Sequence, residues 1–325
     1  MLTLDQFAGE QFLGYVENVP PQRQYILSRF MPVEQVYDLK FAYNVINKKY
    51  GRTASITGFD SDAPLRDKDG LSQAFGEVAK VQHGFRISEY ELLRFKNPRR
   101  PEERQKAIDY VYDQTDNLIQ GVYDVEEWMR GQAIYKGALQ YAENGVVINV
   151  DYNIPSANKM VTTTSWSDTN ANPLQDLQKV VDQYKEANKG EAPAEIHVSS
   201  KVKNDLLKSK AVILQVYGDA DSRRLISNND LTSVLDGLDL PPIVVQDTKI
   251  DNGNGLERLL PERRIVALGG EIGKLYNGPT VEKNFDTGMY VLPVIETKPP
   301  RQEVYVGETV FPGITDVNGI VWMDV

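Results

Sequence analysis

The sequence predicts an α+β fold in which one long helix separates two β-rich regions. Residues 101–141 contain no proline after the first position, and apolar side chains recur there at spacings of three and four, the period of a helix face. The segment before this helix is rich in strand and turn residues, and the segment after it alternates strands with short helices. These observations indicate a spine helix with a hairpin on one side and a mixed sheet region on the other.

The spine helix is expected to begin at Pro101, because the first turn makes no use of the N–H that proline lacks. Glu102 and Glu103 complement the positive end of the helix. Gly121, Gly131 and Gly137 each weaken a helix by about 1 kcal/mol relative to alanine where exposed, so we expect a bend or a break near Gly131. The predicted apolar stripe consists of Ile108, Val111, Tyr112, Thr115, Leu118, Ile119, Val122, Tyr123, Trp128 and Met129.

Composition narrows the possible function classes. The chain has 325 residues, no cysteine and two histidines, which excludes disulfides and thiolate metal sites and leaves little room for histidine chemistry. A formal charge of −10 disfavours a nucleic-acid-binding surface, which needs a basic patch. No apolar run approaches eighteen residues and no cleavable signal is evident, so a cytoplasmic product is expected.

Residues 1–50 are interpreted as an arm. Pro20-Pro21 interrupts any long helix, Phe30-Met31-Pro32 is a short apolar stretch, and Val36–Phe41 alternates like a half-buried strand. Such an arm has too few apolar groups to fold alone. It either docks on its own domain or lies across a neighbouring subunit, and the sequence leaves these alternatives open.

Residues 51–95 are interpreted as a long hairpin with strands at 53–59 and 77–87 and a polar connection between them. A two-stranded hairpin alone in water is marginal, so it must lie on this chain's core or on another copy. Asp67–Gly70 resembles part of a calcium loop. However, the first and twelfth ligand positions would be Leu65 and Gly76, so turn chemistry is preferred and no metal site is predicted.

The region after the spine predicts two further β segments around an α/β unit of roughly residues 173–275. His197 lies in an apolar run and is interpreted as structural. Gly269–Gly273 follows a strand, but its glycine spacing and the missing βαβ unit exclude a dinucleotide site, and no cofactor is predicted. The expected strands are 146–152 paired with 159–166, then 196–198, 243–246, 265–268, 289–296, 302–306, 309–311 and 319–323, with helices from Asn172-Pro173 to 188 and from Ser199-Ser200 to 207.

This order of elements resembles the tailed-phage major capsid proteins, specifically the lambda-type capsid protein E family. The resemblance extends over nearly the whole chain, and the order of elements carries it without a diagnostic short motif. The resembling stretches are Pro20–Phe41, Ala63–Arg66 through Phe85–Ile87, the helix entry Trp166…Asn172-Pro173-Leu174, Leu268–Gly270 with Tyr276–Gly278, and Val291–Val325.

The resemblance implies a tailed-phage major capsid protein fold divided into an N-terminal arm (1–50), an extended loop (51–95), a peripheral domain with the spine helix (96–172), an axial domain (173–285) and return strands of the peripheral domain (286–325). It implies a subunit that self-assembles into pentamers and hexamers of an icosahedral head enclosing the double-stranded DNA genome of a bacteriophage. The implied partners are other copies, a separate scaffolding protein, a portal protein, a decoration protein, and packaged DNA bound without sequence specificity. The implied location is the virion capsid, assembled in the host cytoplasm, with no membrane.

Function in such a subunit would reside in its interfaces. An interface role and a role in the subunit's own core are both open for each candidate, which are Phe30 and Met31 on the arm and Phe59, Leu65, Phe75, Val81 and Phe85 on the hairpin. One alternative is an encapsulin-like nanocompartment shell with the same fold and a cargo enzyme. Another is an α/β enzyme using Glu126 and Glu127. Adjacent helix residues point about 100° apart, and paired acids usually form a solvated face, so we predict no catalytic site.

Overall fold

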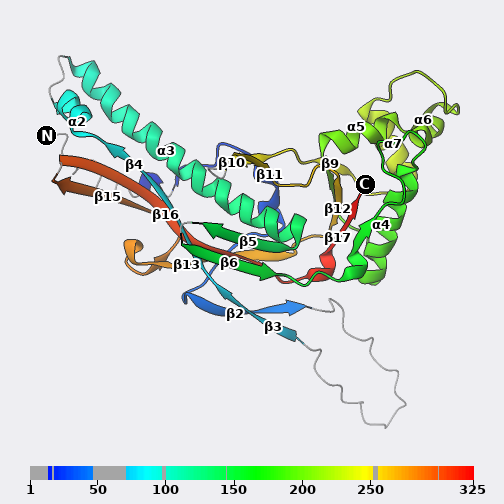
Figure 1. Ribbon diagram of the computed structural model, residues 1–325, viewed down its shortest axis with the longest axis horizontal. Coiled ribbons are helices and arrows are strands. Elements are labelled where there is room, and N and C mark those ends of the chain that lie inside the picture. The colour runs from blue at the N-terminus through cyan, green and yellow to red at the C-terminus, as the bar shows by residue number, and fades with distance from the viewer. Residues whose placement is uncertain are drawn as a thin grey trace, which may run out of the picture.

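The computed structural model describes residues 14–16, 18–46, 71–96, 100–143, 145–251, 255–298 and 300–325. The molecule is elongated, and helix α3 (Pro101–Gly131) runs diagonally over the long strands β4 (Ala79–Ile87) and β16 (Pro300–Ile314). A smaller α/β unit, which includes the C-terminus, lies at one end of the molecule (Figure 1). A hairpin extends from the middle of the body. The predicted mixture of one spine helix with strand-rich regions on both sides is confirmed.

The spine helix begins at Pro101 as predicted, and its apolar stripe faces the sheet beneath it. The α-helix ends at Gly131 and continues as a π-helical turn, η3 (Gln132–Lys136), so the expected break is confirmed. The prediction that the helix continues to residue 141 is wrong. Gly137 adopts a φ of 68°, a left-handed conformation that ends helices, and the chain then enters a strand.

Strand β16 is the centre of a six-stranded sheet. One of its edges pairs with β4 over residues 302–310, and the other pairs first with β15 (Tyr290–Thr297) and then with β13 (Gly273–Thr280). The sheet is completed by the short strands β1 (Val33–Gln35), which runs parallel to β13, and β14 (Asp286–Thr287). The helix α2 (Glu89–Lys96) connects β4 with the spine.

The hairpin differs from its sequence prediction. Its ladder pairs β2 (Lys40–Ile46) with β3 (Leu71–Glu77), so residues 71–76, which were assigned to the connection, form a strand. The first predicted strand, 53–59, lies outside the described residues. The predicted strand at 36–41 is also wrong, because residues 37–39 bend between β1 and β2. Strands β3 and β4 are separated by Val78 alone, whose N–H donates to the carbonyl of Leu39.

The predicted pairing of 146–152 with 159–166 is wrong as well. Strand β6 (Val146–Asp151) pairs with β5 (Ala138–Glu143), which follows directly from the helix stop at Gly137. Strand β7 (Lys159–Val161) instead joins β17 (Ile320–Asp324) in parallel. Between β6 and β7 the chain passes through the left-handed residue Asn153 and the one-turn helix η4 (Ser156–Asn158).

The α/β unit contains a five-stranded sheet in the order β7-β17-β12-β8-β9, with β8 at Glu195–Val198, β9 at Ile243–Val245 and β12 at Arg264–Leu268. Helix α4 (Pro173–Ala187) starts as predicted, because the Asn172 side chain accepts from the N–H of Gln175 and Pro173 occupies the first turn. The Ser199 cap of α5 is confirmed too. The remaining elements are α5 (Ser200–Lys208), α6 (Lys210–Tyr217), α7 (Asn228–Gly237), β10 (Lys249–Asp251), β11 (Leu256–Arg258), η2 (Ile26–Arg29), η5 (Val281–Lys283) and η6 (Val317–Gly319).

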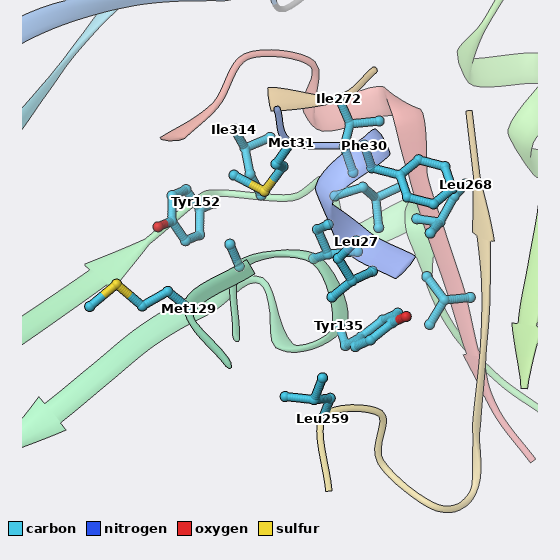
Figure 2. Close-up of a cluster of buried hydrophobic side chains, with 14 of the residues drawn as sticks. Leu27, Phe30, Met31, Met129, Tyr135, Tyr152, Leu259, Leu268, Ile272 and Ile314 are labelled. Atoms are coloured by element: carbon cyan, nitrogen blue, oxygen red, sulfur yellow. The ribbon is translucent and has the colours of Figure 1, made fainter. Parts of the chain in front are cut away.

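One hydrophobic core joins the six-stranded sheet and the five-stranded sheet. It takes side chains from the spine end, from both sheets and from the N-terminal residues Leu27, Phe30 and Met31. Figure 2 shows these three side chains among Tyr135, Leu268, Ile272 and Ile314. The α/β unit has a second core beneath α4, and the outer part of the spine covers a third. The N-terminal residues are therefore part of what fixes the two sheets to each other.

Candidate assembly surfaces

The base of the hairpin is anchored by an aromatic cluster. Phe41 and Tyr43 of β2 pack on Tyr276 of β13, with ring centroids 4.6 Å and 5.5 Å away, and both also approach Phe311 of β16. Burial raises the pKa of Tyr43 to about 12, so this phenol stays neutral at physiological pH. One face of the hairpin is thereby fixed to the body, and its direction is set within the subunit.

The opposite face of the hairpin is open. Phe75 is 79% exposed on this face, directly across the ladder from the exposed Ala42. A bulky aromatic side chain in water on a projecting element is typical of a contact with another molecule. Of the predicted interface residues that the structure describes, Phe75 is the one with a largely exposed side chain.

The remaining candidates lie elsewhere. Phe30 and Met31 are buried in the core that joins the two sheets. Val81 and Phe85 are half-buried on β4 and pack against the cores under the spine. Phe59 and Leu65 lie outside the described residues. The structure therefore does not bring the candidates together as one surface, and an interface role for each stays a prediction.

Strand β4 is held to the spine helix at His83. The His83 Nε2 lies 2.6 Å from the carbonyl oxygen of Leu118, and its ring sits against Gly121. A Cβ at position 121 would lie far inside contact distance of the His83 ring. This close approach explains why a glycine occupies position 121, where the sequence alone indicated only a local weakening of the helix.

We expect Gly121→Ala to lower the free energy of unfolding by about 1 kcal/mol, because overpacking costs roughly 1–3 kcal/mol and exceeds the gain of about 1 kcal/mol in helix propensity. Urea unfolding of the subunit measures this change. In a His83→Ala background the same substitution should become stabilising, since the ring is gone. A stabilising effect of Gly121→Ala in the wild-type background would contradict the packing argument.

A groove of about 1320 Å³ lies between β4, the spine and the β5–β6 hairpin. Val81, Val125, Trp128 and Ile148 give it an apolar floor. Lys136 at its rim contacts Glu257 of β11 at 2.6 Å, and the indole N–H of Trp128 donates to the same carboxylate. The groove is thus a preformed concave surface beside the root of the projecting hairpin.

The N-terminal segment, here residues 18–36, lies along the spine of its own subunit over residues 19–31 and pairs with β13 over residues 33–35. The backbone N–H of Gln22 donates to Gln120 at 2.7 Å, the hydroxyl of Tyr25 to Asp124 at 2.8 Å, and the N–H of Leu27 to Glu127 at 2.9 Å. Burial and the hydrogen bond to Asp124 raise the pKa of Tyr25. For these residues the structure favours docking on the subunit's own domain. Residues 1–13 lie outside the described part.

The prediction of a solvated acidic face at Glu126 and Glu127 is wrong. Both side chains are buried, and Arg130 contacts Glu126 at 2.9 Å and Glu127 at 3.7 Å. Glu308 of β16 joins them from below the helix. The local pattern could not reveal this cluster, since Glu308 reaches it from the other end of the chain. An i,i+4 Glu–Arg pair within an apolar stripe was the available signal.

His197 of β8 is structural in its surroundings, being fully buried with Nδ1 2.6 Å from the hydroxyl of Tyr135. Its other nitrogen contacts Glu195, which also pairs with Arg29 of the N-terminal segment. Burial acts to raise the pKa of Glu195, but His197 and Arg29 together hold it below its usual range. This network ties the spine end and the N-terminal segment to the α/β unit.

The described residues contain no group of three His, Cys, Asp or Glu side chains placed to hold a metal ion. Within the same ranges, no helix has both the length and the apolarity that a bilayer crossing requires. The α/β unit carries one strongly exposed apolar residue at its tip, Leu225, between α6 and α7. What the arrangement offers is a set of surfaces: a projecting hairpin, a groove and an exposed tip.

The fold is that of phage capsid proteins. A phage-related protein from Bordetella bronchiseptica matches with a TM-score of 0.57 at 10% identity, over 97% of this chain and 96% of that one. A prophage protein from Escherichia coli, described as a capsid protein, matches with a TM-score of 0.57 at 14% identity, over 78% and 79%. A chain of the procapsid of satellite phage P4 matches with a TM-score of 0.50 at 12% identity, over 97% and 98%.

The sequence identifies the family itself. The model of the family "phage major capsid protein E" matches residues 10–299, so the chain belongs to this family. Comparison with the curated proteins gave no match. The family match confirms the resemblance found in the sequence, and it supports a capsid shell protein over the nanocompartment alternative.

Proposed function

We propose that this protein is the subunit from which the icosahedral head of a tailed double-stranded DNA phage is built, in pentamers and hexamers, and that it acts through its surfaces and catalyses no reaction. The observation that carries the proposal is the family match over residues 10–299. In the proposed division, residues 1–50 form the arm, 51–95 the extended loop, 96–172 with 286–325 the peripheral domain, and 173–285 the axial domain.

The projecting hairpin supports this assignment. Its base is fixed by aromatic packing, whereas Phe75 on its outer face is in water. In a closed shell each subunit offers one surface and receives a different one, and rotation symmetry closes the ring. A rigidly based hairpin with an apolar outer face suits such a heterologous contact with a neighbouring copy. The exposed Leu225 at the tip of the α/β unit suits contacts around the symmetry axes in the same way.

The partners proposed for this subunit follow from the same assignment. A separate scaffolding protein would guide assembly in the host cytoplasm, a portal protein would occupy one vertex, and a decoration protein would bind the outside. The net charge of −10 supports a shell that encloses DNA without gripping it, because a basic inner wall would bind phosphate nonspecifically.

Shortening the hairpin should abolish assembly and leave the subunit folded. Ile46 and Leu71 face each other in the antiparallel ladder, so residues 47–70 can be replaced by Asn-Gly, which favours a two-residue hairpin turn. We expect unfolding of the isolated subunit to be little changed, because the aromatic base is intact. Electron microscopy after co-expression with a scaffolding protein should show no closed particles.

A matched variant distinguishes the length of the replaced segment from the contacts of its side chains. Here residues 47–70 are replaced by a glycine–serine segment of the same length, which keeps the span and removes the side chains. We expect this variant to fail in assembly as well. Because Phe75 is retained, closed particles from the Asn-Gly variant would show that residues 47–70 are not needed for assembly.

A further inference from the structure

Three buried acids meet one buried base beneath the N-terminal segment. Glu126, Glu127 and Arg130 come from the end of α3, and Glu308 comes from β16. Each of these four residues is more than nine-tenths buried. One guanidinium therefore faces three carboxyl groups in a nearly dry environment and cannot balance all three charges.

Glu308 is buried beside Glu126 and Arg130. One oxygen of Glu308 accepts from Asn277 at 2.7 Å, and the other has no hydrogen-bond partner among the described residues. Two carboxyl groups in such contact cannot both be ionised. Burial first, and Glu126 second, hold the pKa of Glu308 well above its usual range. Glu308 therefore keeps its proton near neutral pH, and Arg130 pairs with Glu126 at 2.9 Å.

Glu127 is the third acid of the cluster. Its Oε1 accepts from the N–H of Leu27, whereas its Oε2 has no hydrogen-bond donor among the described residues and lies 3.7 Å from Arg130. Burial raises the pKa of Glu127 to about 7, against the lowering effects of Leu27 and Arg130. Near neutral pH this carboxyl therefore gains or loses a proton inside a core that is otherwise balanced.

We propose that Glu127 is a proton-dependent latch for the N-terminal segment, holding it on the spine when protonated and loosening it when ionised. The segment is bound to this cluster from both sides, since Leu27 donates to Glu127 and the Met31 carbonyl accepts from Arg130 at 3.1 Å. Lifting the segment would admit water to the carboxyl. The latch lies within one subunit and does not depend on shell assembly.

The direction of the effect follows from proton linkage. A carboxyl whose pKa is raised in the docked state binds its proton more tightly there than in the open state. Its stabilising contribution is complete below the ordinary carboxyl pKa and is lost as the pH rises through about 7. An ionised Glu127 accepts the Leu27 N–H more strongly, but the raised pKa means that desolvation outweighs this gain.

Other charged groups face the cluster from each element packed on it. His197 is the main alternative origin of a pH effect on the segment, because Arg29 of the segment pairs with Glu195, which contacts His197. The experiment must therefore separate Glu127 from His197. The facing groups are Tyr25 and Arg29 from the segment, Tyr123 and Asp124 from α3, Glu308 from β16, Tyr135 from η3, and Glu195 and His197 from β8.

Hydrogen exchange of the full chain tests the latch. Protection of peptides covering residues 25–31 is followed by mass spectrometry from pH 6 to pH 8.5 and normalised to an unstructured peptide, which removes the intrinsic pH dependence. With one group of pKa about 7, the opening equilibrium should rise about tenfold over this range. A flat profile in the wild-type protein would refute the proposal.

Two variants assign the effect. Glu127→Gln keeps the acceptor for Leu27 and cannot ionise, so its protection should vary less than twofold with pH. Glu308→Gln replaces a carboxyl group that is already protonated in this pH range, so its transition should stay at the wild-type pH. As a control, Glu282→Gln alters an ion pair with Lys80 away from the cluster and should keep the wild-type profile. If the tenfold change persists in Glu127→Gln, or if Glu308→Gln abolishes it, Glu127 is not the latch.

Discussion

Replacing Arg130 by methionine should lower the free energy of unfolding by about 3–5 kcal/mol, because it leaves buried carboxylates without their base. The guanidinium is almost completely buried, contacts Glu126 and Glu127, and donates to the carbonyl of Met31. Methionine has a similar length and fills the space, so the loss reports charge and hydrogen bonding more than a cavity. Urea unfolding of the unassembled subunit at pH 7.5 measures this loss.

The deficit of Arg130→Met should shrink in acid, because protonation of the carboxyl groups removes the unbalanced charge. A matched control is Arg86→Met, which removes an arginine that also pairs with a poorly exposed carboxylate, that of Glu303, at 2.8 Å. Its guanidinium is exposed to solvent and Arg301 also contacts Glu303, so the expected loss is below about 1 kcal/mol. Equal losses of unfolding free energy in the two variants would show that the buried cluster contributes no more to stability than an exposed ion pair.

The sequence predicted those elements whose signals are local. The spine follows from apolar spacing and Pro101, and α4 follows from the Asn172 cap and Pro173. Strand β3 was missed because the polar and glycine-containing stretch 71–76 has no strand period of its own. Its ladder with β2 fixes it as a strand, and such pairing is a long-range property.

The candidate surfaces were less predictable for the same reason. Phe75 and Met31 are both bulky apolar residues close to turns, and the local pattern does not distinguish the exposed one from the buried one. Burial of Met31 depends on Ile314 and Tyr152, which come from distant parts of the chain. The charge cluster likewise needs Glu308, so a local interpretation of Glu126 and Glu127 as a solvated face could not have found it.

Met31→Ala and Phe75→Ala should separate folding from assembly. Met31 is fully buried in the core that joins the two sheets (Figure 2), so truncation should cost about 2–5 kcal/mol of unfolding free energy. Phe75 is 79% exposed, so its truncation should change that free energy by no more than about 0.5 kcal/mol. Urea unfolding of isolated subunits gives both values.

In the assembly assay the two variants should rank in the opposite order, with Phe75→Ala the more defective. Phe75→Ala subunits should be as stable as wild type and yet give fewer closed particles by electron microscopy, because we propose that this exposed aromatic side chain contacts a neighbouring copy. Met31→Ala should lower particle yield only in proportion to the fraction of unfolded subunits, and assembly at reduced temperature should recover it. If Met31→Ala subunits were instead stable and unable to assemble, Met31 would have the interface role that the sequence left open.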